Sequence, residues 1–147
     1  MLHLKTARLA RWQVRLLCYS GGLLWVTGAI WLFLHNFGQI EGAFGPQTNP
    51  AEPWMMRLHG AAMLAALLGA GSLLVVHVWR GWHYRSQRVL GLMLTIIVGL
   101  LILSGYLLYY VGDEALRPLI SAGHWIAGLI ILPIFILHYR RGRRSRA

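Results

Sequence analysis

Acidic side chains are almost absent from this sequence. Its 147 residues include four Asp or Glu against fourteen Lys or Arg, which gives a formal net charge of +10 with histidine neutral. The four acids are Glu41, Glu52, Asp113 and Glu114, and all of them lie between long apolar runs rather than inside one. Runs without carboxylates lack the proton relay or cation pathway that membrane pumps use. The sequence therefore argues against a pump.

Cysteine is equally scarce. Cys18 is the only one, so no disulfide can form within the chain. No Cys-x-x-Cys-His sequence is present to attach a c-type haem covalently. Because Cys18 lies inside an apolar run, we expect it to be a small apolar packing residue.

Polar surface is the third shortage, since 57% of the residues are hydrophobic, only 12% are charged and the mean hydropathy is +0.56. A soluble domain of this size could not bury so much apolar surface, so the bilayer must be its solvent. Four segments exceed the ~20 residues that a helix needs to cross ~30 Å of hydrocarbon. They are 14–36, 54–79, 89–111 and 118–139. We expect an all-α, four-helix membrane bundle that forms one domain over residues 1–147, without a cleaved signal peptide.

The basic residues orient the expected helices. Twelve of the fourteen lie before or at the start of the first segment, between the second and third, or after the fourth, whereas all four acids fall in the other two connections. By the positive-inside rule, both ends of the chain are cytoplasmic. Because this topology and contact with anionic membrane lipid account for the net charge, we expect no nucleic-acid partner.

The first outer connection is long and has an unusual composition. Its sequence, NFGQIEGAFGPQTNPAEP, is rich in Gly, Pro and Asn, which favours an irregular segment over a helix. A connection of this length in so short a chain is either a docking surface or a plain connector, and the sequence leaves both open.

A weak internal repeat relates the two halves of the chain. The first segment ends TGAIWLF (27–33) and the third ends SGYLLYY (104–110), each with a hydroxyl, a glycine and an aromatic-rich run. The repeat predicts two helix hairpins related by a pseudo-twofold axis. Five glycines either allow close helix packing or make room for a flat macrocycle. They are Gly28, Gly69, Gly71, Gly105 and Gly128.

Four histidines fall at two matched depths of the second and fourth segments. His59 and His124 lie five and six residues in from the outer ends, or ~8 Å along each helix. His77 and His138 lie just before the arginines of the inner ends. A polar ring without a partner is expensive to bury in lipid. Two pairs at two depths are the pattern needed for two bis-histidine haems stacked across the membrane.

Helical phase bears on the same pairs. Eighteen residues make five full α-helical turns, so His59 and His77 should share a face, ~27 Å apart. Fourteen residues fall about 40° short of four turns, so His124 and His138 should nearly share one, ~21 Å apart. Because the two spans differ by about 6 Å, one haem b rather than two is the alternative. His35 is the rival outer ligand.

The remaining candidates follow from location. Haem propionates need basic partners, and Arg57 near the outer pair is the main one, since positive charge is disfavoured on that side. For Arg80, Arg85 and Arg140 near the inner pair, lipid headgroups are the alternative partner. His3 and His83 are expected to be solvated.

Two motifs carry a family resemblance. LHG…HVWRGW (58–60 and 77–82) and HWIAG…HYRRG (124–128 and 138–142) resemble the small bacterial cytochromes b of the b(561)-like four-helix superfamily. That superfamily includes the cytochrome b subunits of membrane formate dehydrogenase, hydrogenase and thiosulfate reductase. The resemblance covers nearly the whole chain, and its most specific part is the fourteen-residue spacing of His124 and His138.

The resemblance implies a set of ligands. His124 would ligate the outer haem together with His59, and His138 would ligate the inner haem. In the formate dehydrogenase type the other inner ligand lies at the cytoplasmic start of the first helix. Here that stretch reads ARWQVRLLCY (10–19) and contains no histidine. His77 is therefore expected in its place, and the family's quinone site does not carry over directly.

Taken together, these patterns predict a dihaem cytochrome b of a bacterial inner membrane. It would carry electrons between a periplasmic redox protein or c-type cytochrome and the quinone pool of a respiratory chain, alone or as the quinone-reactive subunit of a larger complex. No catalytic side chain is expected. Candidates for a quinone pocket, which are equally members of an interfacial belt, are Arg15, Tyr19, His83 and Tyr84 at the inner side and Tyr109 and Tyr110 at the outer side.

Two other classes of function remain as alternatives. One is a cofactor-free membrane anchor or assembly subunit whose histidines are merely interfacial. The other is a transition-metal carrier, which is weaker because His59 and His77 are too far apart to share one metal site.

Overall fold

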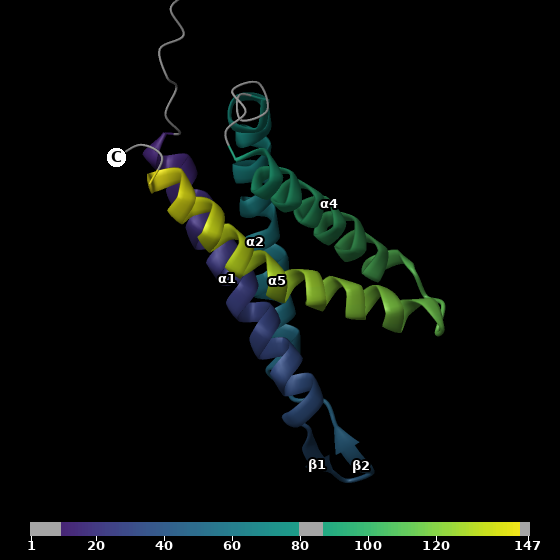
Figure 1. Ribbon diagram of the computed structural model, residues 1–147. Helices are drawn as coiled ribbons and strands as arrows, with labels where there is room; N and C mark the ends of the chain where they lie inside the picture. The colour runs from purple at the N-terminus through teal and green to yellow at the C-terminus, as the bar shows by residue number, and fades with distance from the viewer. Residues whose placement is uncertain (1–9, 80–86, 145–147) are drawn as a thin grey trace, which may run out of the picture. The chain divides into compact units, whose positions relative to one another are not determined.

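The described part of the chain forms four long α-helices (Figure 1). The computed structural model describes residues 10–79 and 87–144. The helices are α1 (Arg11–Phe37), α2 (Glu52–Leu73), α4 (Arg88–Tyr110) and α5 (Leu116–Arg144), and a five-residue π-helical turn, η1 (Leu74–Val78), continues α2. All four α-helices are long and apolar enough to cross a membrane. The prediction of an all-α, multi-pass membrane protein is confirmed.

The helices pair into two hairpins, α1 with α2 and α4 with α5. These hairpins belong to two compact units of the chain, 1–84 and 85–147. In the first, Gln13 near the start of α1 donates from Nε2 to the Ser72 hydroxyl near the end of α2 at 3.2 Å, so the two helices run antiparallel. In the second, Cδ2 of Leu101 lies 3.9 Å from the position that a Cβ on Gly128 would take.

Polar side chains satisfy the helix ends near the second connection. The Arg117 guanidinium donates to the carbonyls of Leu108 and Val111 at 2.8 and 3.2 Å, where α4 ends. Asp113 Oδ1 accepts from the backbone N–H groups of Ala115 and Leu116, where α5 begins. The last carbonyls and first amides of a helix have no partner within it, and lipid offers none. Arg117 therefore has a structural reason to lie on the side where basic residues are rare.

Burial is inverted relative to a soluble protein. Among the described residues, the buried side chains are small or polar: Ala62 is 4% exposed, Ser20 5%, Thr27 2% and Glu52 7%. Leucines, isoleucines and valines along all four helices are exposed. Apolar side chains are cheap to expose to lipid and polar ones are not. The polar groups therefore lie in the seam between helices, as a bilayer requires.

The first outer connection is not wholly irregular. It contains a two-stranded antiparallel hairpin, β1 (Ile40–Gly42) and β2 (Gly45–Gln47), which extends past the ends of α1 and α2 (Figure 1). Gly45 has φ 111°, a conformation that glycine adopts without strain. The expectation of an irregular segment is wrong in this part, because the tight turn lets the chain pair with itself. Phe44, at the tip, is 99% exposed.

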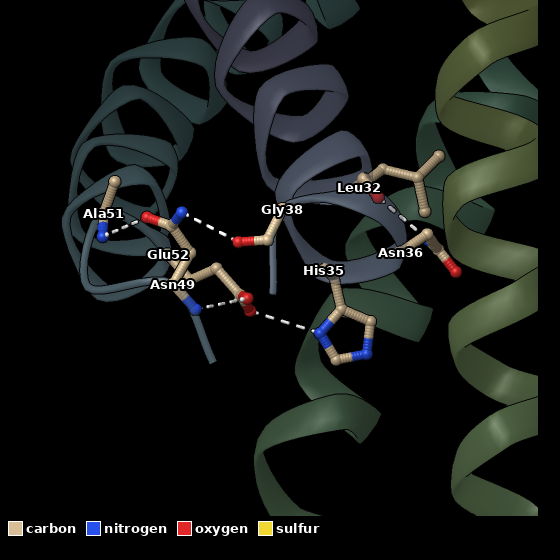
Figure 2. Close-up of polar contacts among 7 residues, drawn as sticks. All are labelled: Leu32, His35, Asn36, Gly38, Asn49, Ala51 and Glu52. Carbon is tan, nitrogen blue, oxygen red and sulfur yellow. Dashed lines mark hydrogen bonds and ion pairs between the residues drawn. The ribbon is translucent and has the colours of Figure 1, made fainter. Parts of the chain in front are cut away.

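A polar clasp, made of His35, Asn49 and Glu52, holds this connection against the end of α1 (Figure 2). Glu52 Oε2 lies 3.1 Å from Nδ1 of His35, and its Oε1 accepts from the Asn49 N–H at 3.3 Å. The side-chain Nδ2 of Asn49 in turn donates to the Gly38 carbonyl at 2.9 Å. Trp31 stacks on the His35 ring with the centroids 4.7 Å apart. Glu52 thus joins the connection, α1 and α2 through one buried carboxylate.

We expect Glu52→Ala to loosen this connection. The change removes two hydrogen bonds from a buried site, so it should lower the free energy of unfolding by about 1–3 kcal/mol. Thermal unfolding in detergent micelles measures the loss, and limited proteolysis of residues 38–51 localises it. Glu41→Ala is the matched control because Glu41 lies exposed in the same connection. Equal effects of the two substitutions would contradict the clasp.

Candidate functional site

His59 lies in the seam of the first hairpin and meets two consecutive residues of α1. Its Nδ1 is 3.0 Å from the hydroxyl of Thr27. A Cβ added to Gly28 would lie only 3.3 Å from Cε1 of the ring. The imidazole therefore occupies space that is available because residue 28 is glycine. The Thr27 hydroxyl also donates to the Leu23 carbonyl at 2.7 Å.

His124 has the same surroundings in the second hairpin. Its Nδ1 is 2.8 Å from the hydroxyl of Ser104, and a Cβ on Gly105 would lie 3.4 Å from its Cε1. The Ser104 hydroxyl donates to the Leu100 carbonyl at 2.6 Å. Each hairpin thus contains one hydroxyl–glycine pair against one imidazole, a combination that we call the imidazole cradle.

The imidazole cradles also agree in depth. His59 is seven residues from the start of α2 and His124 is eight from the start of α5, or about 10–12 Å along each helix. The internal repeat of the sequence is therefore a repeat of contacts. The sequence repeat contains the hydroxyl and the glycine in both halves but does not show that they contact the histidines, because residues 32 and 20 positions apart meet only when each hairpin closes.

His138 lies on the same seam of the second hairpin. A Cβ on Gly91 would be 3.9 Å from its Cε1, and its Nδ1 is shielded from solvent. Gly91 and Gly105 of α4 are fourteen residues apart, as are His124 and His138 of α5. Both histidines therefore share the face of α5 that meets α4, with Pro133 inside the same helix between them. This agrees with the phase expected from their spacing.

His77 lies in the π-helical turn η1 and is half-buried. A turn closed by i→i+5 bonds takes up one residue more than an α-turn, so the residues beyond it rotate by as much as about 100° relative to a continuous α-helix. The expectation that His59 and His77 share a face assumed α-helical geometry throughout, and η1 removes that basis. Single π-turns inside helices occur frequently at functional sites.

The other basic candidates are peripheral. His35 belongs to the polar clasp. Arg57 is exposed, with its guanidinium carbon 4.7 Å from the centroid of the Trp54 ring, and Arg140 is exposed near the end of α5. His3, Arg80, His83, Tyr84 and Arg85 lie outside the described residues.

Several smaller expectations can be compared with the structure. Cys18 is exposed on α1, so the expectation that it packs against other residues is wrong. Gly69 meets Leu17 of α1 at 3.0 Å from its added Cβ, as a close-packing glycine should, whereas Gly71 has nothing within 4 Å. The quinone candidates on the described helices are exposed; these are Arg15, Tyr19, Tyr109 and Tyr110.

Within residues 10–79 and 87–144, no three His, Cys, Asp or Glu side chains come together as a metal site. Comparisons of the chain with models of protein families, with curated proteins and with solved structures gave no match. The histidines and their imidazole cradles are therefore the observations on which a function must be argued.

We expect Gly28→Ala to disturb its imidazole cradle, because the new methyl group, 3.3 Å from Cε1 of His59, would force the ring to move by a few tenths of an ångström; Gly105→Ala, at 3.4 Å from Cε1 of His124, should have a smaller effect. Gly21→Ala in α1 and Gly99→Ala in α4 are the controls, since nothing lies within 4 Å of their added Cβ atoms. The controls should gain about 0.5–1 kcal/mol of stability from the lost glycine. The cradle variants should not show this gain. Thermal unfolding measures it, and the imidazole NMR resonances of His59 and His124 report ring movement. Four variants with equal behaviour would contradict the tight contacts.

Proposed function

We propose that this protein is a membrane cytochrome b that binds two haems and carries electrons across a bacterial inner membrane. The observation that carries the proposal is the pair of imidazole cradles, which hold His59 and His124 by the same contacts and at the same depth in two successive hairpins. Under this proposal a pseudo-twofold axis along the membrane normal relates the hairpins, and both termini are cytoplasmic.

The residues of the imidazole cradles fit a haem. Haem iron accepts two imidazole nitrogens, and one histidine from each hairpin supplies that pair. In both cradles the Nδ1 side of the ring meets the hydroxyl, so Nε2 would be the ligating atom. The glycine beside each ring allows it to lie close to the helix backbone. His59 and His124 would hold the outer haem, and His77 and His138 the inner one.

The role of the protein in this function is to bind, orient and insulate. Bound haem supplies one-electron exchange between its ferric and ferrous states. The histidines fix the position of the iron, while the apolar helices exclude water from its surroundings. Arg57, exposed at the outer end, would pair with a propionate.

The partners follow from the two sides of the membrane. A periplasmic redox protein or c-type cytochrome would exchange electrons at the outer side, and the quinone pool would exchange them within the membrane. The same arrangement serves a stand-alone carrier or the cytochrome subunit of a larger oxidoreductase. A cofactor-free anchor is the competing class, and the matched polar contacts around two half-buried histidines favour the cytochrome over it.

The first test is the haem content of the purified full-length chain, expressed with adequate haem supply. We expect a bis-histidine b-type spectrum in the dithionite-reduced minus oxidised difference, with two haems per chain by pyridine haemochrome. His59→Ala and His124→Ala should each remove the same haem. His77→Ala and His138→Ala should each remove the other, because loss of either axial ligand releases the iron.

His35→Ala is the control, since His35 contacts Glu52 in the polar clasp, and it should retain both haems. Loss of the outer haem in this variant would move the outer ligand to α1. A folded chain that takes up no haem would leave the anchor as the better explanation.

A further inference from the structure

The two hydroxyls of the imidazole cradles have a single proton each, and its position constrains the histidines. Thr27 Oγ1 lies 2.7 Å from the Leu23 carbonyl, to which it donates, and 3.2 Å from the Leu24 carbonyl, which also hydrogen-bonds the His59 imidazole. Ser104 Oγ donates to the Leu100 carbonyl at 2.6 Å, with Leu101 at 3.3 Å. A hydroxyl that has given its proton to a carbonyl can interact with a third group only through a lone pair. Toward the imidazole, each of these hydroxyls is therefore an acceptor.

An acceptor at 3.0 or 2.8 Å requires a proton on the ring nitrogen that faces it. The neutral imidazole then carries its hydrogen on Nδ1 and its lone pair on Nε2. Metal-ligating histidines use this arrangement, in which a partner for one nitrogen fixes the tautomer and makes the other nitrogen a stronger donor. In each hairpin, the hydroxyl of a threonine or serine on the neighbouring helix is this partner.

We infer that Thr27 and Ser104 are positioning residues that fix the Nδ1–H tautomer of His59 and His124 and thereby lower the reduction potential of the outer haem, an inference that rests on the proposed function. Each hydroxyl is polarised by its own bond to a carbonyl, which makes it a better acceptor for Nδ1–H. A histidine with more electron density on Nε2 stabilises ferric over ferrous iron. Second-shell hydrogen bonds of this kind tune metal sites in general.

The decisive variants remove the hydroxyls with little change of shape. In Thr27→Val and Ser104→Ala the midpoint potential of the outer haem should move to a more positive value. We expect about a tenfold change in the ferric-to-ferrous equilibrium, which corresponds to about 59 mV for one electron. Thr27→Ser and Ser104→Thr keep the hydroxyl, so the outer haem in these variants should have the same midpoint potential as in the original chain. Potentiometric titration of the haem absorption bands in nanodiscs measures all four.

Two matched controls separate this effect from a general change in the helices. Ser20 in α1 donates to the Leu16 carbonyl at 2.6 Å, and Thr95 in α4 donates to the Gly91 carbonyl at 2.9 Å. These are the same intrahelical bonds without a contact to an imidazole nitrogen. Ser20→Ala and Thr95→Val should therefore leave the potential of the outer haem unchanged. A shift as large in the controls as in the cradle variants would overturn the inference.

A second readout does not need bound haem. Imidazole ¹⁵N shifts of the haem-free chain, recorded at about pH 8.5, above the range in which imidazole takes up protons, distinguish the two neutral tautomers. We expect the Nδ1–H form for His59 and His124. Ser104→Ala should remove it from His124, and Thr27→Val should lower its population at His59, where the Leu24 carbonyl remains as a second acceptor. An Nε2–H form in the original chain, or unchanged tautomers in the variants, would overturn the inference.

The two readouts distinguish failure of the inference from failure of the proposed function. If the chain binds two haems but neither variant alters the potential, the cytochrome stands and the positioning role is wrong. If the chain binds no haem, the proposed function fails, and the tautomer measurement still decides whether the hydroxyls control the imidazoles. If a cradle variant loses haem altogether while its hydroxyl-restoring partner keeps it, the positioning role is supported.

Discussion

The hydrogen bond between a helix hydroxyl and an imidazole is the interaction on which the rest of this structure depends. Hydrocarbon supplies no partner for a polar group, so a histidine inside a membrane hairpin must find one on the neighbouring helix. Thr27 and Ser104 provide that partner, and Thr27 is also the least exposed of the buried side chains, at 2%. The glycine that follows each hydroxyl brings the ring close enough for the contact. Close packing of the helices at the glycine is therefore what allows the imidazole to reach its hydrogen-bond partner.

The histidines of the two hairpins lie in different local structures. His59 and His124 lie on regular helix, and each meets a hydroxyl. His77 lies in a π-turn, and His138 follows Pro133 within the single helix α5. A π-turn changes the direction of the residues after it.

The sequence predicted the features that depend on composition and spacing. The four spans, the connections between them and the matched depths of His59 and His124 follow from apolar runs and residue counts, and the helix ends differ by only a few residues. Phase was predicted well for His124 and His138, because Gly105 and Gly91 confirm a shared face. For His77 the prediction assumed a continuous α-helix, and the π-helical turn over Leu74–Val78, which the sequence does not indicate, removes that basis. The pairing of Glu52 with His35 was also not foreseen, because it depends on how the outer connection folds back.

The hydrogen bond that orients each outer imidazole is made within a single hairpin. It can therefore form as soon as that hairpin enters the bilayer, before the two halves of the chain need to meet. Each hairpin then reaches assembly with its imidazole already in contact with a hydroxyl of the same hairpin. In a cytochrome built this way, haem binding would be the last folding step. The haem would then link two hairpins that had folded separately. The conformational entropy of the histidine side chains would already have been lost during membrane insertion, before haem binds.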